Sequence, residues 1–543
     1  MTRGPRFRAA APRLAAAAFA CLLVLPRASA RQVSDVRTYM VPMRDGVRLA
    51  TDVRLPDGSG PWAAVLMRTP YGRSRTAGGL EHYAIVCQDV RGRGDSEGCA
   101  RPFFDDGWGE HQDGFDTVTW ILAQPWCNGK IGTLGPSALG ITQSLLAGTD
   151  PPGVLCQHIS VACGSLYHHM AYPGGTFRQA LVAGWLEEAA WPADNLGLIF
   201  NHPAYDELWR TVDSVACVAQ ERVTIPAVHI GGWFDIFAQG TIDSFVSRSR
   251  VAPNQWMIIG PWAHAIKREI GEFAFPSNAI ELPPLADPEQ RPLWFDFWLA
   301  GKDTGLRGIP RVHYYVMGAC DEEGAPGNQW RTADSWPVAA QPTRFFLAPA
   351  GELVRQAPTT TSTATYDYDP ADPVPTRGGG NLLIPAGPMD QREVEQRPDV
   401  LSFTTATLTY PVEVTGQVTV QLWASSSARD TAFTAKLCDV YPDGRSMLLC
   451  DGALRAACRE SFSELSPIEP GEMYEFNIDV GSTSIIFNQG HRIRVAISSS
   501  NYPRFATHPN VWGEGAPQVA HQTIYFGGDH PSAVILPIVA ITE

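Results

Sequence analysis

After its first thirty residues the sequence has no apolar run that could cross a bilayer, and it has fewer basic than acidic residues. A membrane-spanning helix needs about 20 apolar residues. The 42 Lys and Arg residues are outnumbered by 56 Asp and Glu residues, which gives a net charge of −14. Since nucleic acids and anionic membranes are bound through basic patches, we expect neither as a partner, and we expect no membrane anchor. The sequence does not indicate an oligomeric state.

The sequence also lacks the cysteine spacing of common metal and redox sites. None of its 11 cysteines belongs to a Cys-x-x-Cys pair, which argues against a zinc or dithiol site. The adjacent His168 and His169 have no ligand partners at zinc spacing, so a core or surface pair is the better interpretation. We therefore expect no metal and no cofactor.

Residues 1–30 are typical of an export signal. Arginines surround the apolar stretch Leu14–Leu25, and small residues end the segment at Ala30. We expect cleavage after Ala30 and a secreted or periplasmic protein. Ten cysteines follow that position, and in an oxidising compartment we expect some of them to form disulfides.

The rest of the chain divides into regions with different patterns, and 543 residues are too many for one hydrophobic core. Short apolar runs at 62–67, 83–90 and 130–134 alternate with turns and helical patterns, as in a mainly parallel sheet. Aromatic residues at helical spacing follow, and runs rich in Val, Thr, Phe and Tyr recur after residue 330. The expected parts are an α/β core at 31–165 and 222–330, a helical insertion at 166–221, and an all-β sandwich at 331–543.

Two local features are also predicted. Alternating apolar and polar residues around Asp45-Gly46 predict a β-hairpin from about residue 37 to 56. The segments Thr359–Thr365 and Gly378–Gly380 are expected to be flexible surface loops, because small and polar residues dominate them.

A serine in a glycine-rich turn is the first candidate for catalysis. The predicted strand 130–134 runs into Gly135-Pro136-Ser137-Ala138-Leu139-Gly140, and a helical pattern follows. This is the context of a nucleophile elbow, where a sharp strand-to-helix turn exposes the serine hydroxyl. In the common pattern Gly-x-Ser-x-Gly, the second glycine stands where this chain has Leu139. On its own, the motif also fits a serine that merely caps a helix.

Two further candidates follow later strands. The apolar run 225–230 leads to Asp235, and the run 256–259 leads to His264. Functional groups of α/β sheets gather at the carboxyl ends of strands. Serine, aspartate and histidine, in that order, form the α/β-hydrolase triad. The sequence therefore predicts Ser137 as nucleophile, His264 as its base and Asp235 as the residue that orients the imidazole.

Several segments together carry a family resemblance. They are RDGVRLATDV at 44–53, RTPYG at 68–72, DVRGRGDSEG at 89–98, QPWCNGKIGTLGPSALG at 124–140, GGWFD at 231–235 and GPWAH at 260–264. The tail adds FTAKLCDVYPDG at 433–444 and GHRIRVAISSSNYPRF at 490–505. Over nearly its whole length the chain resembles the cocaine esterase / X-Pro dipeptidyl-peptidase group, the CocE/NonD hydrolases.

The resemblance implies a fold and a mechanism. The fold is an α/β-hydrolase core with an inserted helical cap, followed by a C-terminal jelly-roll-like β-sandwich, with the active site where the three meet. The resemblance also implies that the Tyr71 phenol and the backbone N–H of Ala138 form the oxyanion hole. An aromatic residue commonly follows the nucleophile in this group, so Ala138 opens the pocket beside Ser137. The expected enzyme is a serine hydrolase that cleaves carboxylic ester or amide bonds through an acyl-enzyme.

Aromatic residues are the candidates for the substrate pocket. Trp185, Trp191 and Trp209 lie in the helical insertion that is expected to roof Ser137. Trp233 and Phe234, directly before Asp235, complete the candidate set. Each of these side chains also fits an ordinary place in a hydrophobic core.

Three functions remain open at this point. An esterase or acylase for uncharged small-molecule substrates is preferred, because Asp235 is followed by Ile236 and Phe237 and not by acids that would bind a substrate ammonium. The alternative is an X-Pro dipeptidyl-peptidase or aminoacyl hydrolase, for which Glu187 and Glu188 are candidate ammonium ligands, although paired acids on a helix also fit a solvated face. The third is a catalytically silent secreted binding protein.

Overall fold

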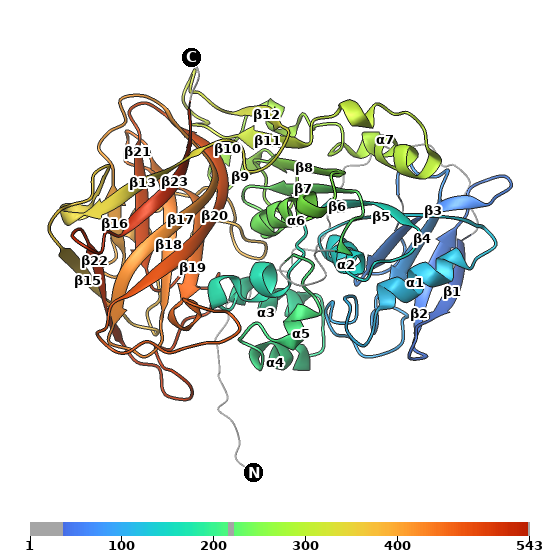
Figure 1. The fold of residues 1–543 in the computed structure, drawn as a ribbon, viewed down its shortest axis with the longest axis horizontal. Coiled ribbons are helices and arrows are strands. Elements are labelled where there is room, and N and C mark those ends of the chain that lie inside the picture. The colour runs from blue at the N-terminus through green and yellow to red at the C-terminus, as the bar shows by residue number, and fades with distance from the viewer. Residues whose placement is uncertain (1–35, 76, 216–221, 541–543) are drawn as a thin grey trace, which may run out of the picture.

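The computed structural model describes residues 36–75, 77–215 and 222–540, so the predicted export signal and cleavage site lie outside the described residues. Figure 1 shows an α/β part, a β-rich part beside it, and a group of short helices where they meet. This arrangement confirms the predicted fold class.

The α/β part is built on a ten-stranded sheet in the order β1-β2-β4-β3-β5-β6-β7-β8-β11-β12. From β4 to β11 neighbouring strands run parallel, and the edges are antiparallel. The strands are β1 (Val36–Pro42), β2 (Arg48–Arg54), β3 (Trp62–Thr69), β4 (Ala84–Asp89), β5 (Cys127–Pro136), β6 (Val154–Ser160), β7 (Ala227–Gly232), β8 (Gln255–Gly260), β11 (Val312–Val316) and β12 (Gln329–Ala333).

Apolar residues explain why these strands lie in the middle of the sheet. Every residue of β4, β7 and β8 is buried, as expected for strands that helices cover on both faces. The helices of this part are α1 (Asp113–Leu122), α2 (Ala138–Ala147), α6 (Ala238–Val251) and α7 (Arg291–Phe295). The hairpin predicted around Asp45-Gly46 is confirmed, since β1 and β2 pair in antiparallel register on either side of it.

Short elements fill the segment between β6 and β7. They are η1 (Tyr167–Ala171), η2 (Pro173–Gly175), α3 (Gln179–Glu188), α4 (Asp194–Phe200) and α5 (Glu207–Arg210). Their aromatic side chains pack around Tyr167, whose ring contacts those of Tyr172, Tyr205 and Trp209. In Figure 1 these helices lie between the two larger parts, so we call this segment the cap.

The C-terminal part is all β. Its eleven strands are β13 (Gln341–Ala348), β14 (Glu352–Val354), β15 (Ser362–Tyr368), β16 (Leu401–Thr404), β17 (Val412–Ser426), β18 (Ala432–Val440), β19 (Ser446–Arg455), β20 (Tyr474–Phe487), β21 (Arg492–Ser498), β22 (Ala520–Phe526) and β23 (Ala533–Val539). The long strand β17 pairs with β20, β22 and β23. A long strand of this kind allows two sheets to pack face to face around a shared core.

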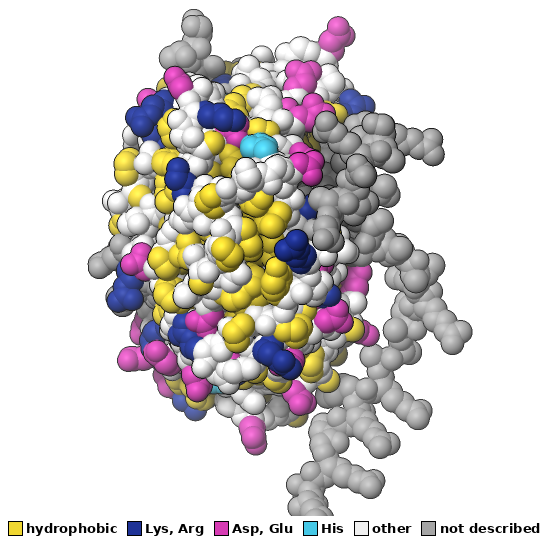
Figure 2. Space-filling model, turned by 90° about the vertical axis from the view of Figure 1, so that its right-hand side faces the viewer, with side chains coloured by type: hydrophobic (Ala, Val, Ile, Leu, Met, Phe, Trp, Pro, Cys, Tyr) yellow, Lys and Arg dark blue, Asp and Glu magenta, His cyan; other side chains and the backbone are white. Residues whose placement is uncertain are grey.

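Minor elements lie within the α/β part and the C-terminal part. They are β9 (Glu269–Ile270), β10 (Phe273–Ala274), η4 (Ser277–Ile280), η5 (Pro288–Gln290), η6 (Asp296–Ala300), η7 (Leu306–Gly308), η8 (Pro349–Gly351), α8 (Arg392–Glu395) and η9 (Ala456–Cys458). No helix among the described residues is both long and apolar enough to span a membrane. Figure 2 shows one end of the molecule, where hydrophobic side chains gather at the centre and side chains of both charges are interspersed around them.

Three expectations about local structure are wrong. Most of Thr359–Thr365 belongs to a strand, because β15 pairs along its whole length with β22. Gly378–Gly380 is not a flexible surface loop, since Gly378 and Gly379 are buried and the Gly379 N–H donates to the Gly387 carbonyl. The nine cysteines that the structure describes are all free. Most of them lie in apolar surroundings, where burial raises the pKa of thiols such as Cys156 and Cys163.

Candidate active site

Ser137 occupies a strained turn between β5 and α2. Its backbone angles are φ 55° and ψ −125°, a region that residues with a side chain rarely adopt. The Ser137 N–H donates to the Ser160 carbonyl at 2.9 Å, which ties the turn to the end of β6. The turn therefore has the backbone strain of a nucleophile elbow, with its serine at the carboxyl end of the sheet.

Two glycines make this turn possible. Gly135 has φ 152°, and a Cβ there would lie 2.4 Å from the Leu139 Cβ. A Cβ on Gly140 would lie 2.6 Å from the Ala162 Cβ. Gly140 thus provides the close approach between helix and sheet, and Leu139 packs where Gly135 leaves room. This packing accounts for the shift of the second glycine by one position in this chain.

Asp235 and His264 follow β7 and β8, which are neighbours in the sheet. Asp235 is buried, and its Oδ1 accepts a hydrogen bond from the Phe237 N–H at 2.8 Å. Its Oδ2 lies 2.6 Å from Nδ1 of His264. The His264 Nε2 lies 2.8 Å from Oγ of Ser137. The structure therefore brings the three predicted side chains into one hydrogen-bonded chain, with the imidazole in the middle.

Tyr71 and Ala138 come from the same edge of the sheet as Ser137. Tyr71 follows β3, which pairs with β5, so Tyr71 and Ser137 extend from neighbouring strand ends. Ala138 is the first residue of α2, where a helix leaves its N–H groups without partners inside the helix. Tyr71 is 44% exposed, yet the protein around its phenol desolvates it and raises its pKa. A phenol with a raised pKa stays neutral at neutral pH and remains a hydrogen-bond donor.

The predicted pocket residues separate into two groups. Trp185 contacts the site, since its indole Nε1 donates to the Tyr71 hydroxyl at 2.9 Å, and Trp191 packs against Trp185 with ring centroids 5.4 Å apart. The other three are accounted for by packing. Trp209 is 1% exposed in the cap and donates to the His202 carbonyl, while Trp233 and Phe234 pack in the main hydrophobic core.

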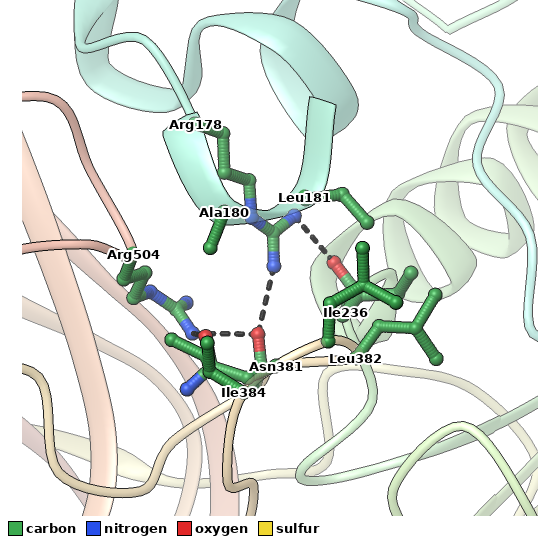
Figure 3. A pocket seen from close by; sticks show the side chains of 10 residues that line it. Arg178, Ala180, Leu181, Ile236, Asn381, Leu382, Ile384 and Arg504 are labelled. Atoms are coloured by element: carbon green, nitrogen blue, oxygen red, sulfur yellow. Dashed lines mark hydrogen bonds between the residues drawn. The ribbon is translucent and has the colours of Figure 1, made fainter. Parts of the chain in front are cut away.

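Sequence reasoning missed Arg178, which joins the three parts of the molecule. Arg178 is buried before α3, and its guanidinium donates to the carbonyls of His169 at 3.0 Å, Ile236 at 2.7 Å and Gly380 at 2.9 Å. Figure 3 shows Arg178 and Arg504 reaching the Gly380 turn from different elements. Burial and the neighbouring Arg504 lower the pKa of Arg178 to about 9.

The turn at Gly380 brings the C-terminal part to the site. A Cβ on Gly380 would lie 2.9 Å from the Asp235 carbonyl oxygen, so the turn touches the segment that carries Asp235. Leu383 packs equally closely on the cap, because a Cβ on Gly184 of α3 would lie 2.7 Å from it. The run of three glycines was the only sign of this turn in the sequence. It did not predict the packing, because glycine is favoured both in flexible loops and where segments pack closely.

The histidine pair and the other candidate metal ligands do not converge. No group of three His, Cys, Asp or Glu residues within 36–75, 77–215 and 222–540 is arranged to hold a metal ion. His169 Nε2 lies 2.9 Å from Asp243, and burial lowers the pKa of His168 to about 4. His169 thus belongs to the packing between the cap and α6, whereas His168 packs against Tyr205 of the cap and Phe462 of the C-terminal part.

Comparison with known proteins identifies the family. Residues 45–195 and 190–266 match the model of the X-Pro dipeptidyl-peptidase (S15 family), and residues 304–535 match the X-Pro dipeptidyl-peptidase C-terminal non-catalytic domain. Cocaine esterase from a Rhodococcus species is 35% identical over 93% of this chain and 99% of its own length. The chain belongs to the S15 family. The predicted resemblance is thereby confirmed, and so is the prediction of an enzyme of the serine hydrolase class.

Solved structures agree on the S15 fold. An aminopeptidase from a marine sediment archaeon of the Thaumarchaeota superimposes with a TM-score of 0.78, at 24% identity over 95% of this chain and 99% of its own. An α-amino acid ester hydrolase gives a TM-score of 0.75, at 24% identity over 96% and 99% of the two chains. At these identities the likeness establishes only the fold. The substrate has to be inferred from the residues of this chain.

Proposed function

We propose that this S15 enzyme is a secreted carboxylic-ester hydrolase that acts through Ser137, His264 and Asp235. The observation that carries the proposal is the hydrogen-bonded chain from Ser137 Oγ through both ring nitrogens of His264 to Asp235. A buried carboxylate at one end and an elbow serine at the other are the arrangement that nucleophilic acyl transfer needs.

His264 accepts and returns the proton in each half of the proposed mechanism. As Ser137 Oγ forms a bond to the acyl carbon, its proton passes to His264 Nε2, and Asp235 stabilises the resulting imidazolium. The carbonyl oxygen becomes an oxyanion that the Tyr71 hydroxyl and the Ala138 N–H stabilise. His264 then gives the proton to the departing alcohol oxygen as the C–O bond breaks. Water, deprotonated by His264, releases the acid from Ser137 in the second half of the cycle.

The charges near Tyr71 favour an uncharged acyl group. The guanidinium of Arg75 lies 5.9 Å from the centre of the Tyr71 ring, and Arg93 also faces the phenol and lowers its pKa against the effect of burial. Glu187 and Glu188 are exposed at the end of α3. An ammonium held near the Tyr71 phenol would meet these two cations, and its burial without a carboxylate partner would cost several kcal/mol.

One observation supports the second candidate, an X-Pro dipeptidyl-peptidase or aminoacyl hydrolase. Besides burial, the Glu188 carboxylate contributes to the raised pKa of Tyr71, so one carboxylate lies near the phenol. Matched butyryl and α-aminobutyryl esters and an Ala-Pro anilide separate the two candidates. We expect the butyryl ester to be the best substrate; preference for the amino-bearing substrates would move the enzyme to the second candidate.

Active-site labelling tests the nucleophile. The wild-type enzyme should react with a fluorophosphonate and hydrolyse a short-chain p-nitrophenyl ester, whereas Ser137→Ala should do neither and lose about 10⁴-fold or more in turnover. Ser74→Ala, at an exposed serine just after Tyr71, is the matched control and should keep both activities. If Ser137→Ala kept a tenth of the turnover, another residue would be the nucleophile.

Export is the remaining part of the proposal. The support is the segment 1–30, with its arginines, its apolar stretch and its small residues before Arg31. N-terminal sequencing of the protein recovered outside the cytoplasm should begin at Arg31. An intact Met1 on an enzyme confined to the cytoplasm would contradict the proposal.

A further inference from the structure

The Tyr71 hydroxyl is held by a partner that can only donate. The indole Nε1 of Trp185 lies 2.9 Å from Tyr71 Oη. Indole has one N–H and no acceptor, whereas a phenol both donates and accepts. The tyrosine oxygen is therefore the acceptor in this pair, and its own hydrogen must point elsewhere.

That hydrogen is not bonded to any acceptor among the described residues. Within residues 36–75, 77–215 and 222–540, the bond from Trp185 is the one hydrogen bond that the Tyr71 side chain makes. An oxygen that accepts a hydrogen bond becomes a stronger donor through its own hydrogen, because the two bonds polarise each other. The phenol is thus oriented and strengthened as a donor before any substrate arrives.

The indole itself is fixed by an aromatic cluster. Trp185 stacks on Phe103 with the rings 5.6 Å apart and nearly parallel, at 4°. Its other neighbour, Trp191, lies 4.6 Å from the guanidinium of Arg93. Arg93 in turn donates to the carbonyls of Ala189 and Pro70. The segment just before Tyr71 and the end of α3 are therefore joined through one arginine, and the distance between phenol and indole is held from both sides.

We infer that Trp185 is a positioning residue for the oxyanion hole: its indole N–H fixes the Tyr71 hydroxyl as a donor aimed at the acyl oxygen. This inference rests on the proposed function, since it assigns Trp185 a task only if Tyr71 stabilises the oxyanion. The indole N–H of this aromatic cap residue then has a polar role that burial of the ring alone does not require.

The first test is to remove the N–H and keep the ring. Trp185→Phe should lower kcat by roughly three- to tenfold, the size of one ordinary hydrogen bond, and should change KM much less. Because a smaller ring also loosens the cluster, a second variant carries β-(3-benzothienyl)alanine at position 185, which replaces N–H by sulfur at nearly the same shape. Both variants should lose kcat to a similar extent. Full kcat in the benzothienyl enzyme would overturn the inference.

A double-mutant cycle with Tyr71 separates positioning from packing. In a Tyr71→Phe enzyme there is no hydroxyl to orient, so adding Trp185→Phe should leave kcat unchanged within about twofold. Trp191→Phe is the matched comparison: its indole is buried in the same cluster, and its Nε1 hydrogen-bonds no described residue. The effect of Trp191→Phe should be the same with and without the Tyr71 hydroxyl. Equal losses from Trp185→Phe in both backgrounds would overturn the inference.

Failure of the inference and failure of the proposed function give different results. If the wild-type enzyme reacts with the fluorophosphonate and hydrolyses the ester, but Trp185 and Tyr71 act additively, the positioning role alone is lost. If Ser137→Ala leaves labelling and turnover intact, the proposed function is lost first.

Discussion

The packing of α2 against the sheet predicts that Gly140→Ala destabilises the enzyme, although alanine has the higher helix propensity. Gly140 lies in the first turn of α2, where replacing glycine by alanine usually stabilises a helix by about 0.5–1 kcal/mol. Here the new methyl would lie 2.6 Å from the Ala162 Cβ, and 3.2 Å from both the Gly135 carbonyl oxygen and Cγ2 of Ile159. Overpacking of this kind costs about 1–3 kcal/mol. We expect Gly140→Ala to be less stable than wild type.

A second helical glycine supplies the control. A Cβ on Gly197 in α4 meets nothing within 4 Å, so Gly197→Ala should gain the propensity term without a clash. The difference between the two variants then isolates the clash, about 1–3 kcal/mol. For a unit of 150–250 residues, each kcal/mol corresponds to about 2–4 °C in Tm.

The assay combines thermal denaturation with ester turnover, because α2 also carries the Ala138 N–H. A shift of α2 by about 1 Å would lower kcat by up to about 10²-fold. Adding Ala162→Gly removes the methyl that Gly140→Ala meets, so the double variant should recover both Tm and kcat. If Gly140→Ala raised Tm as Gly197→Ala does, or if Ala162→Gly gave no recovery, the close approach between helix and sheet would not be what requires glycine here.

Three further predictions follow from the contacts around the site. Tyr71→Phe should lower kcat by about 10²–10³-fold with little change in KM, as steady-state kinetics would measure; a change in KM alone would mean that Tyr71 only lines the pocket. Arg178→Met removes the donor of the His169 and Ile236 carbonyls, while the Gly380 carbonyl keeps its bond from Arg504; at about 1–3 kcal/mol for each unsatisfied carbonyl, thermal denaturation should show a loss of about 2–6 kcal/mol, and kcat should fall because the Ile236 carbonyl adjoins Asp235; an unchanged kcat would mean that Arg178 does not influence the site. His491 is buried between Asp439 and Glu322, whose carboxylates outweigh burial and raise its pKa. Its stabilising charge is therefore fully present below the ordinary histidine pKa of about 6.5 and is lost as the pH rises through the raised value, so Tm should fall more from pH 6 to 9 in wild type than in His491→Gln.

The sequence predicted the parts of the site that are local in the chain. The helical pattern expected after Ser137 is α2, and the expected strands before Ser137, Asp235 and His264 are β5, β7 and β8. A sharp turn after a buried strand, with glycines to allow it, is encoded within six residues. Such a pattern is readable because the backbone conformation and the residue type constrain each other directly.

Contacts between distant segments could not be predicted in the same way. Arg178 and Gly380 are 202 residues apart, and the use of a buried arginine for three carbonyls leaves no periodic pattern in the sequence. The contact of Trp185 with Tyr71 could not be predicted either, because in the sequence Trp185 is one of several aromatic residues in the cap. Glycines at 378–380 predicted mobility because turn composition does not distinguish an open loop from one on which another part of the molecule packs.

The contact between Gly380 and the segment of Asp235 means that the enzyme is not divisible at its domain boundary. A fragment ending before β13 would keep every residue of the acyl-transfer chemistry, but it would lose the Gly380 turn that packs against Arg178 and against the segment of Asp235. Conversely, we expect substitutions at 380–384 to alter turnover without touching a reacting atom, because this turn packs against the segment of Asp235 and against α3. Libraries intended to change the substrate range of this enzyme should therefore include that turn, which belongs to the domain that its own family describes as non-catalytic.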